Sequence, residues 1–138
     1  MASKSKRTIF RGIVGVIGLN LLLIGLGFLV APSTLSSQFW IHPSSIAGFA
    51  TLRGDLGGLF IGMAVFTLLG ARPSKSRWLI VPTVFLAAII LGRLVHLFSE
   101  GVSGPSVGPL LLEIVLVIVL IGAQKTLLPT EEYPEEGC

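Results

Sequence analysis

The sequence has few charged residues and a single cysteine, and both shortages limit what the protein can be. Only 12% of its 138 residues are charged, whereas 52% are hydrophobic. A water-soluble domain carries about twice that share of charged residues, so this composition excludes one. The only cysteine is Cys138, the last residue. An internal disulfide, a C-x-x-C redox pair and a cysteine-ligated metal cluster are therefore excluded.

Basic residues outnumber acidic ones, yet the sequence has no continuous basic stretch. The formal net charge is +3, and the cations form short clusters beside apolar runs. Such clusters are typical of membrane topology signals, whereas nucleic-acid binding needs a basic patch or stripe. The sequence therefore predicts the lipid bilayer as a partner, and no nucleic acid.

Four apolar runs fill most of the chain, and short polar segments separate them. The first run, Gly12 to Ala31, is long enough to span about 30 Å of hydrocarbon as a helix. We predict an all-α fold, an integral membrane four-helix bundle, with an up-down-up-down path over residues 12–124. The expected helices cover residues 12–31, 46–69, 78–98 and 109–123, between a basic N-terminus (1–11) and a flexible acidic tail (125–138).

The first run has a competing interpretation as a cleaved signal peptide, because basic residues precede it. It is longer than the roughly 7–15 apolar residues of a signal peptide, and Pro32 follows the only small-residue exit. We therefore expect a retained helix.

The second helix has a defined start. Pro43 is a stop, and Ser45 after it is a typical N-cap residue, so the helix is expected to begin near Ile46.

The distribution of cations predicts the orientation. The N-terminus, the turn after the second helix and the residues after the fourth helix hold eight of the ten Lys and Arg. The two remaining loops hold none. Because positively charged loops stay inside, we expect both termini in the cytoplasm.

Six ionisable residues lie in or beside the apolar runs, all toward the expected outer ends: Arg53, Asp55, Arg93, His96, Glu100 and Glu113. Charged side chains within a bilayer are uncommon, and they pair with one another or mark a binding site. The plainest interpretation is that each extends to the outer headgroups. The alternatives are a structural clamp and a binding pocket at the outer mouth.

Arg93 is the expected hub of this cluster. Consecutive helices with short loops are usually neighbours, so the third helix should contact both the second and the fourth. A guanidinium has five donors and can serve both Asp55 and Glu113. Arg53 should point to the other side, toward a loop, the headgroups or Glu113.

No metal site or cofactor is predicted. His96 and Glu100 stand four residues apart, which allows joint ligation, but two ligands are too few.

Glycines on the second helix are the predicted helix-packing positions: Gly54, Gly57, Gly58 and Gly62. At about 100° per residue, Gly54, Gly58 and Gly62 form one narrow ridge, a doubled G-x-x-x-G. Such a ridge predicts that a neighbouring helix approaches closely.

The stretch LRGDLGG (52–58) followed by Gly62, with Arg93, Glu100-Gly101 and Glu113, resembles a known family. This is the family of small four-helix bacterial membrane proteins catalogued as domain of unknown function 4345, and the resemblance covers nearly the whole chain. It implies a membrane bundle in the bacterial cytoplasmic (inner) membrane and no assigned activity. Asp55 and His96 stand where the family pattern is variable.

Three functions remain open. The first is a non-catalytic membrane protein that packs against a membrane-protein partner or a second copy, using the glycine ridge. The second is binding or transport of a small anion, a lipid headgroup or protons at the outer polar cluster. The third is an acid/base enzyme that uses His96, Glu100 and Glu113.

Overall fold

The computed structural model describes residues 4–102 and 104–127, and every regular element in these ranges is helical. In chain order the elements are α1 (Lys4–Val30), α2 (Pro32–Gln38), α3 (Ile46–Thr51), the π-helix η1 (Leu52–Gly57), α4 (Gly58–Gly70), the 3-10 helix η2 (Ser76–Leu79), α5 (Ile80–Glu100) and α6 (Gly104–Leu127).

Four stretches within the described residues are long and apolar enough to cross a membrane: Lys4–Val30, Ile46–Gly70, Ser76–Glu100 and Val107–Leu127. The prediction of an all-helical chain with four such stretches is confirmed.

The helix bounds differ from the predicted ones at several ends. Helix α1 begins at Lys4, so the basic segment expected before the helix belongs to it. Helix α2 forms in the predicted loop, with Pro32 as its first residue, where a proline needs no hydrogen-bonding N–H. Helix α6 begins at Gly104 and contains Pro109, which the sequence predicted as its first residue. Most of the predicted acidic tail, residues 128–138, lies outside the described residues.

The second apolar stretch is one continuous helical rod made of three parts. The Ser45 hydroxyl accepts a hydrogen bond from the Gly48 N–H at 3.2 Å, so the predicted N-cap is confirmed. After α3 the rod widens into η1, which contains Arg53 and Asp55, and then continues as α4. A π-helix pairs residues five apart and is frequent at functional positions. It also shifts the direction in which the side chains point, relative to a regular α-helix.

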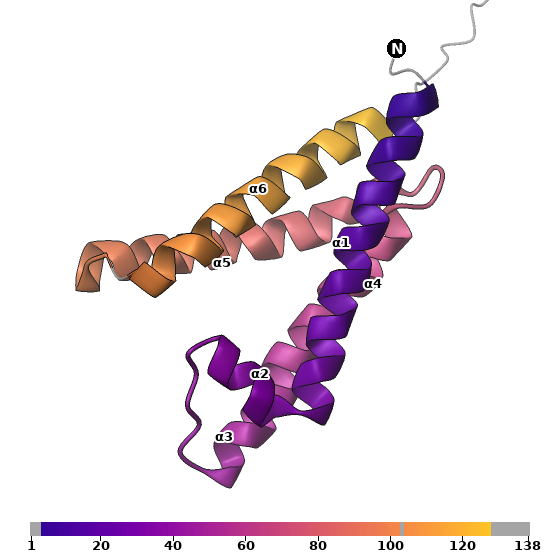
Figure 1. Cartoon of the computed structure of the whole chain (residues 1–138). Helices are drawn as coiled ribbons and strands as arrows, with labels where there is room; N and C mark the ends of the chain where they lie inside the picture. The colour runs from indigo at the N-terminus through magenta and orange to yellow at the C-terminus, as the bar shows by residue number, and fades with distance from the viewer. Residues whose placement is uncertain (1–3, 103, 128–138) are drawn as a thin grey trace, which may run out of the picture.

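Two pairs of helices form two arms that diverge (Figure 1). In the first arm, α1 lies along η1 and α4; in the second, α5 lies along α6. The arms meet at what we call the joined end, formed by the first turns of α1, the turn between α4 and η2, and the last turns of α6. Their other ends, the far ends, lie apart.

The hydrophobic core lies near the joined end. Its buried members are Val14, Leu21, Met63, Ala64, Leu79, Leu86, Leu120, Ala123 and Leu127. In α5 the buried residues, Pro82, Thr83 and Leu86, all lie in its first two turns. Beyond Leu86, no residue of α5 is buried in the described structure. The loss of burial along α5 agrees with the divergence of the arms.

Aromatic rings fix the far end of the first arm. The Phe28 ring stacks on Phe60 with centroids 6.0 Å apart, and Phe39 lies 5.4 Å from Phe28. Phe39 ends the segment that contains α2, so this short helix is held against α1 and α4.

Candidate functional site

Arg93 on α5 and Glu113 on α6 form an ion pair in the second arm. The Arg93 Nε–H donates to both carboxylate oxygens, at 2.9 and 2.8 Å. The Glu113 side chain is 12% exposed and that of Arg93 is 31% exposed. The predicted pairing of these two residues is confirmed. Because the charges cancel, the pair lowers the cost of placing either one among apolar residues.

His96 and Glu100 pair one turn further along α5. His96 Nδ1 lies 2.8 Å from Glu100 Oε2, a contact between residues four apart on one helix face. The side chains are 40% and 70% exposed, so this pair is more accessible than Arg93–Glu113. Among the described residues, no group of three His, Cys, Asp or Glu side chains comes together to hold a metal ion.

Arg53 binds the end of α1. Its Nε–H donates to the Leu29 carbonyl at 3.1 Å. The last carbonyls of a helix have no partner within the helix and carry partial negative charge, so a cation there is favourable. Arg53 therefore fastens η1 to α1, a role that the sequence prediction missed.

Asp55 forms no side-chain hydrogen bond or ion pair with any described residue, and it is exposed on η1. The prediction that Arg93 joins Asp55 to Glu113 is therefore wrong. It assumed that α4 and α5 pack along their whole lengths. Instead α4 packs mainly on α1, and the far ends carrying Asp55 and Arg93 diverge. The six predicted polar residues lie on two arms.

The glycines of the helical rod formed by α3, η1 and α4 also divide into two groups. A Cβ added at Gly54, Gly58 or Gly62 would meet nothing within 4 Å. At Gly57 it would lie 3.3 Å from Leu29 and 3.4 Å from the Gly25 carbonyl. The close intrachain contact is thus between Gly57 and α1. Among the described residues, no other helix comes within 4 Å of a Cβ added at Gly54, Gly58 or Gly62, the predicted ridge, and we call these three glycines the open glycine face.

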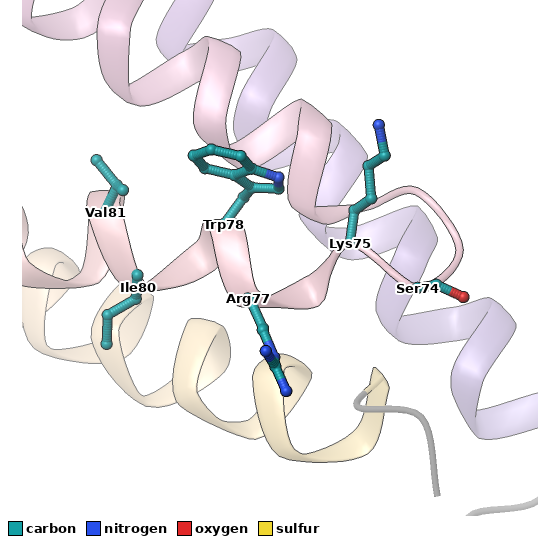
Figure 2. Close-up of a pocket in the computed structure, with 6 residues that line it drawn as sticks. All are labelled: Ser74, Lys75, Arg77, Trp78, Ile80 and Val81. Carbon is teal, nitrogen blue, oxygen red and sulfur yellow. The ribbon is translucent and has the colours of Figure 1, made fainter. Parts of the chain in front are cut away.

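Two cavities lined by described residues lie at the joined end. One, of about 420 Å³, is lined by Lys4, Arg7, Thr8 and Arg11 of α1 and by Ser74. The other, of about 370 Å³, is lined by Ser74, Lys75, Arg77, Trp78, Ile80 and Val81 (Figure 2). Trp78 stacks on Phe66 of α4 with ring centroids 5.4 Å apart. The sequence indicated these cations only as a topology signal.

No known family model matches the chain, and neither does any curated protein or solved structure. The resemblance to domain of unknown function 4345 stays a prediction.

Proposed function

We propose that the chain is a non-catalytic integral membrane protein that self-associates through the open glycine face of α4 and η1. The observation that carries this proposal is that a Cβ added at Gly54, Gly58 or Gly62 would meet nothing within 4 Å, although Gly58 and Gly62, one turn apart on α4, suit a close helix contact.

Membrane placement follows from where the apolar surface lies. Little of each long apolar stretch is buried within the chain. The buried share of its most apolar part is 28% in the first stretch, 28% in the second, 22% in the third and 11% in the fourth. Exposed apolar area of this extent is favourable in lipid and strongly unfavourable in water. The helices then cross in the order up-down-up-down.

The joined end carries eight of the ten Lys and Arg, because it gathers the start of α1, the turn after α4 and the end of α6. The positive-inside rule assigns that end to the cytoplasm, with both termini inside. By the suggested family resemblance, the membrane is a bacterial cytoplasmic (inner) membrane.

Arg53 and Asp55 give the open glycine face a charge pattern that fits a second copy. They flank Gly54 along the chain, so they lie on opposite sides of it on η1. Two copies with the same membrane orientation are related by a two-fold axis along the membrane normal. Around such an axis, Asp55 of each copy comes beside Arg53 of the other. The Arg53 Nε is used by Leu29, which leaves the terminal nitrogens to bind a carboxylate.

Binding or catalysis at the outer polar cluster is less well supported. The residues proposed for it are divided between two arms, and Arg93 is neutralised by Glu113. A structural clamp within the second arm accounts for that pair.

Fluorescence energy transfer in lipid vesicles tests self-association. Cys138 is the only cysteine, so donor and acceptor dyes attach at one position in the full chain. We expect transfer that falls as the protein is diluted with lipid. Gly58→Leu should raise the dissociation constant about tenfold or more, since bulk at this face separates the backbones.

Gly92→Leu is the matched control. Gly92 lies on α5 with nothing within 4 Å of an added Cβ, so it adds the same bulk to a different open face. Equal weakening by both variants would contradict the proposal. So would an absence of concentration-dependent transfer in the natural chain, or a different membrane protein in stoichiometric complex after purification in mild detergent.

A further inference from the structure

Two cavities of different chemistry adjoin at Ser74 in the joined end. Ser74 is the one described residue that lines both of them. The first, which we call the basic cavity, is otherwise lined by residues of the first turns of α1. The second, which we call the apolar cavity, is lined by the start of the third membrane stretch, with its cations before Trp78 (Figure 2).

The basic cavity suits a phosphate group. Lys4, Arg7 and Arg11 are spaced three and four residues apart, so they lie on one face of α1, and none of the described lining residues is acidic. Arginine presents planar, paired donors that match phosphate oxygens, and lysine adds a point charge. The Arg11 Nε is buried and has no hydrogen-bond partner among the described residues. The Thr8 hydroxyl donates its hydrogen bond to the Lys4 carbonyl at 3.1 Å, so the phosphate would be bound by the three cations and not by Thr8.

The apolar cavity suits a hydrocarbon chain. Trp78 and Ile80 are 45% and 51% exposed, and with Val81 they are the apolar side chains that line this cavity. In Figure 2 the Trp78 ring lies against α4, whereas the Arg77 side chain extends toward α6. Trp78 lies near the start of the third membrane stretch, and tryptophan at the end of such a stretch is typical of the boundary between headgroups and hydrocarbon.

We propose that the joined end binds an anionic phospholipid, with its phosphate in the basic cavity and the upper part of an acyl chain against Trp78, Ile80 and Val81. An anionic phospholipid and a free phosphate ion both present a phosphate group to the basic cavity. The adjoining apolar cavity assigns the ligand to a lipid. This inference requires membrane placement, but it requires neither self-association nor a particular orientation.

Quenching of Trp78 by brominated lipids tests the proposal. The chain has two tryptophans, and Trp40→Phe leaves Trp78 as the only one. The full-length protein is placed in phosphatidylcholine vesicles that contain a small fraction of phosphatidylglycerol with brominated acyl chains. The comparison vesicles contain the same fraction of brominated phosphatidylcholine. We expect the association constant from Trp78 quenching to favour phosphatidylglycerol roughly tenfold, given the attraction of each cation for an anionic headgroup.

Substitutions separate a specific site from general charge attraction. Arg7→Gln with Arg11→Gln should reduce the lipid preference nearly to unity. Arg7→Lys with Arg11→Lys, which keeps the charge, should retain part of it. Arg72→Gln with Lys125→Gln removes the same charge from exposed residues that line neither cavity, and should leave the preference unchanged. The helical circular dichroism of each variant verifies that it folds.

Three outcomes would overturn the proposal. The first is equal quenching by the two brominated lipids in the Trp40→Phe protein. The second is an equal loss of preference in the Arg72/Lys125 control. The third is displacement of brominated phosphatidylglycerol by millimolar inorganic phosphate but not by sodium chloride of the same ionic strength, which would identify a free ion as the ligand.

Discussion

Arg93 contacts Glu113 through a single N–H that lies between the two carboxylate oxygens. Its other four donors make no hydrogen bond with a described residue. The energetic weight of the pair therefore depends on its surroundings. The Glu113 side chain is only 12% exposed, so an unpaired carboxylate there would be poorly solvated.

We expect the single changes Arg93→Leu and Glu113→Leu each to lower the free energy of unfolding by about 1–3 kcal/mol, between the values for exposed and buried pairs. The double change should recover part of this loss, because it leaves no uncompensated charge. Denaturant unfolding in mixed micelles measures all four proteins of the cycle.

His96→Leu with Glu100→Leu is the comparison pair. It is more exposed, so its coupling should stay at about 0.5 kcal/mol or less. A double mutant Arg93→Leu/Glu113→Leu no more stable than Arg93→Leu alone would show that the contact does not stabilise the fold.

The residue scale also shows what a sequence predicts well. The Ser45 cap and the Arg93–Glu113 pair follow from local spacing and from the rarity of charge in apolar helices. The Arg53 contact with Leu29 does not, because any free carbonyl at a helix end is an equivalent acceptor in sequence terms.

At the scale of elements, glycines in apolar helices have two different roles: some pack closely against another helix, and others face open space. Gly25 of α1 lies close to the backbone of η1 and α4. A Cβ added at Gly25 would lie 2.9 Å from the Ile61 nitrogen and 3.1 Å from the Gly57 carbonyl. Gly58 is adjacent to Gly57 but faces open space. The first arm is thus held together through Gly25 and Gly57.

We expect Gly25→Ala to lower the free energy of unfolding of the single chain by about 1–3 kcal/mol, because the backbone of α4 cannot yield as a side chain can. Gly58→Ala should not lower it, and the greater helix propensity of alanine favours a small increase. Unfolding is measured in detergent at protein concentrations where the chain is monomeric. Equal destabilisation by both changes would show that the open glycine face is covered within the chain.

Hydropathy predicted the four long helices, but it did not predict which helices pack against each other. An apolar run indicates that a segment lies in lipid. Because nearly every face of such a helix is apolar, the sequence gives little indication of which face packs against another helix. The π-helix η1 adds to the difficulty, because a wheel at 100° per residue does not hold over residues 52–57. The divergence of the arms then separated η1, which contains Asp55, from the later turns of α5, which contain Arg93.

At the scale of the whole molecule, the two arms present different surfaces at their two ends. The joined end combines the core, the clustered cations and both cavities. The middle of the first arm carries the open glycine face, with Arg53 and Asp55 beside Gly54. Lipid recognition and self-association are therefore proposed for different parts of the first arm, its joined end and its middle, and changes at one should leave the other intact.

The proposed dimer makes a prediction that no single substitution can test. Asp55→Arg places arginine on both flanks of Gly54, and Arg53→Asp places aspartate on both. Each variant alone should associate at least roughly tenfold more weakly than the natural chain, because like charges meet across the two-fold axis. A mixture of donor-labelled Asp55→Arg with acceptor-labelled Arg53→Asp should regain energy transfer, since every flank then pairs opposite charges. Transfer in the mixture no higher than in either variant alone would exclude this interface.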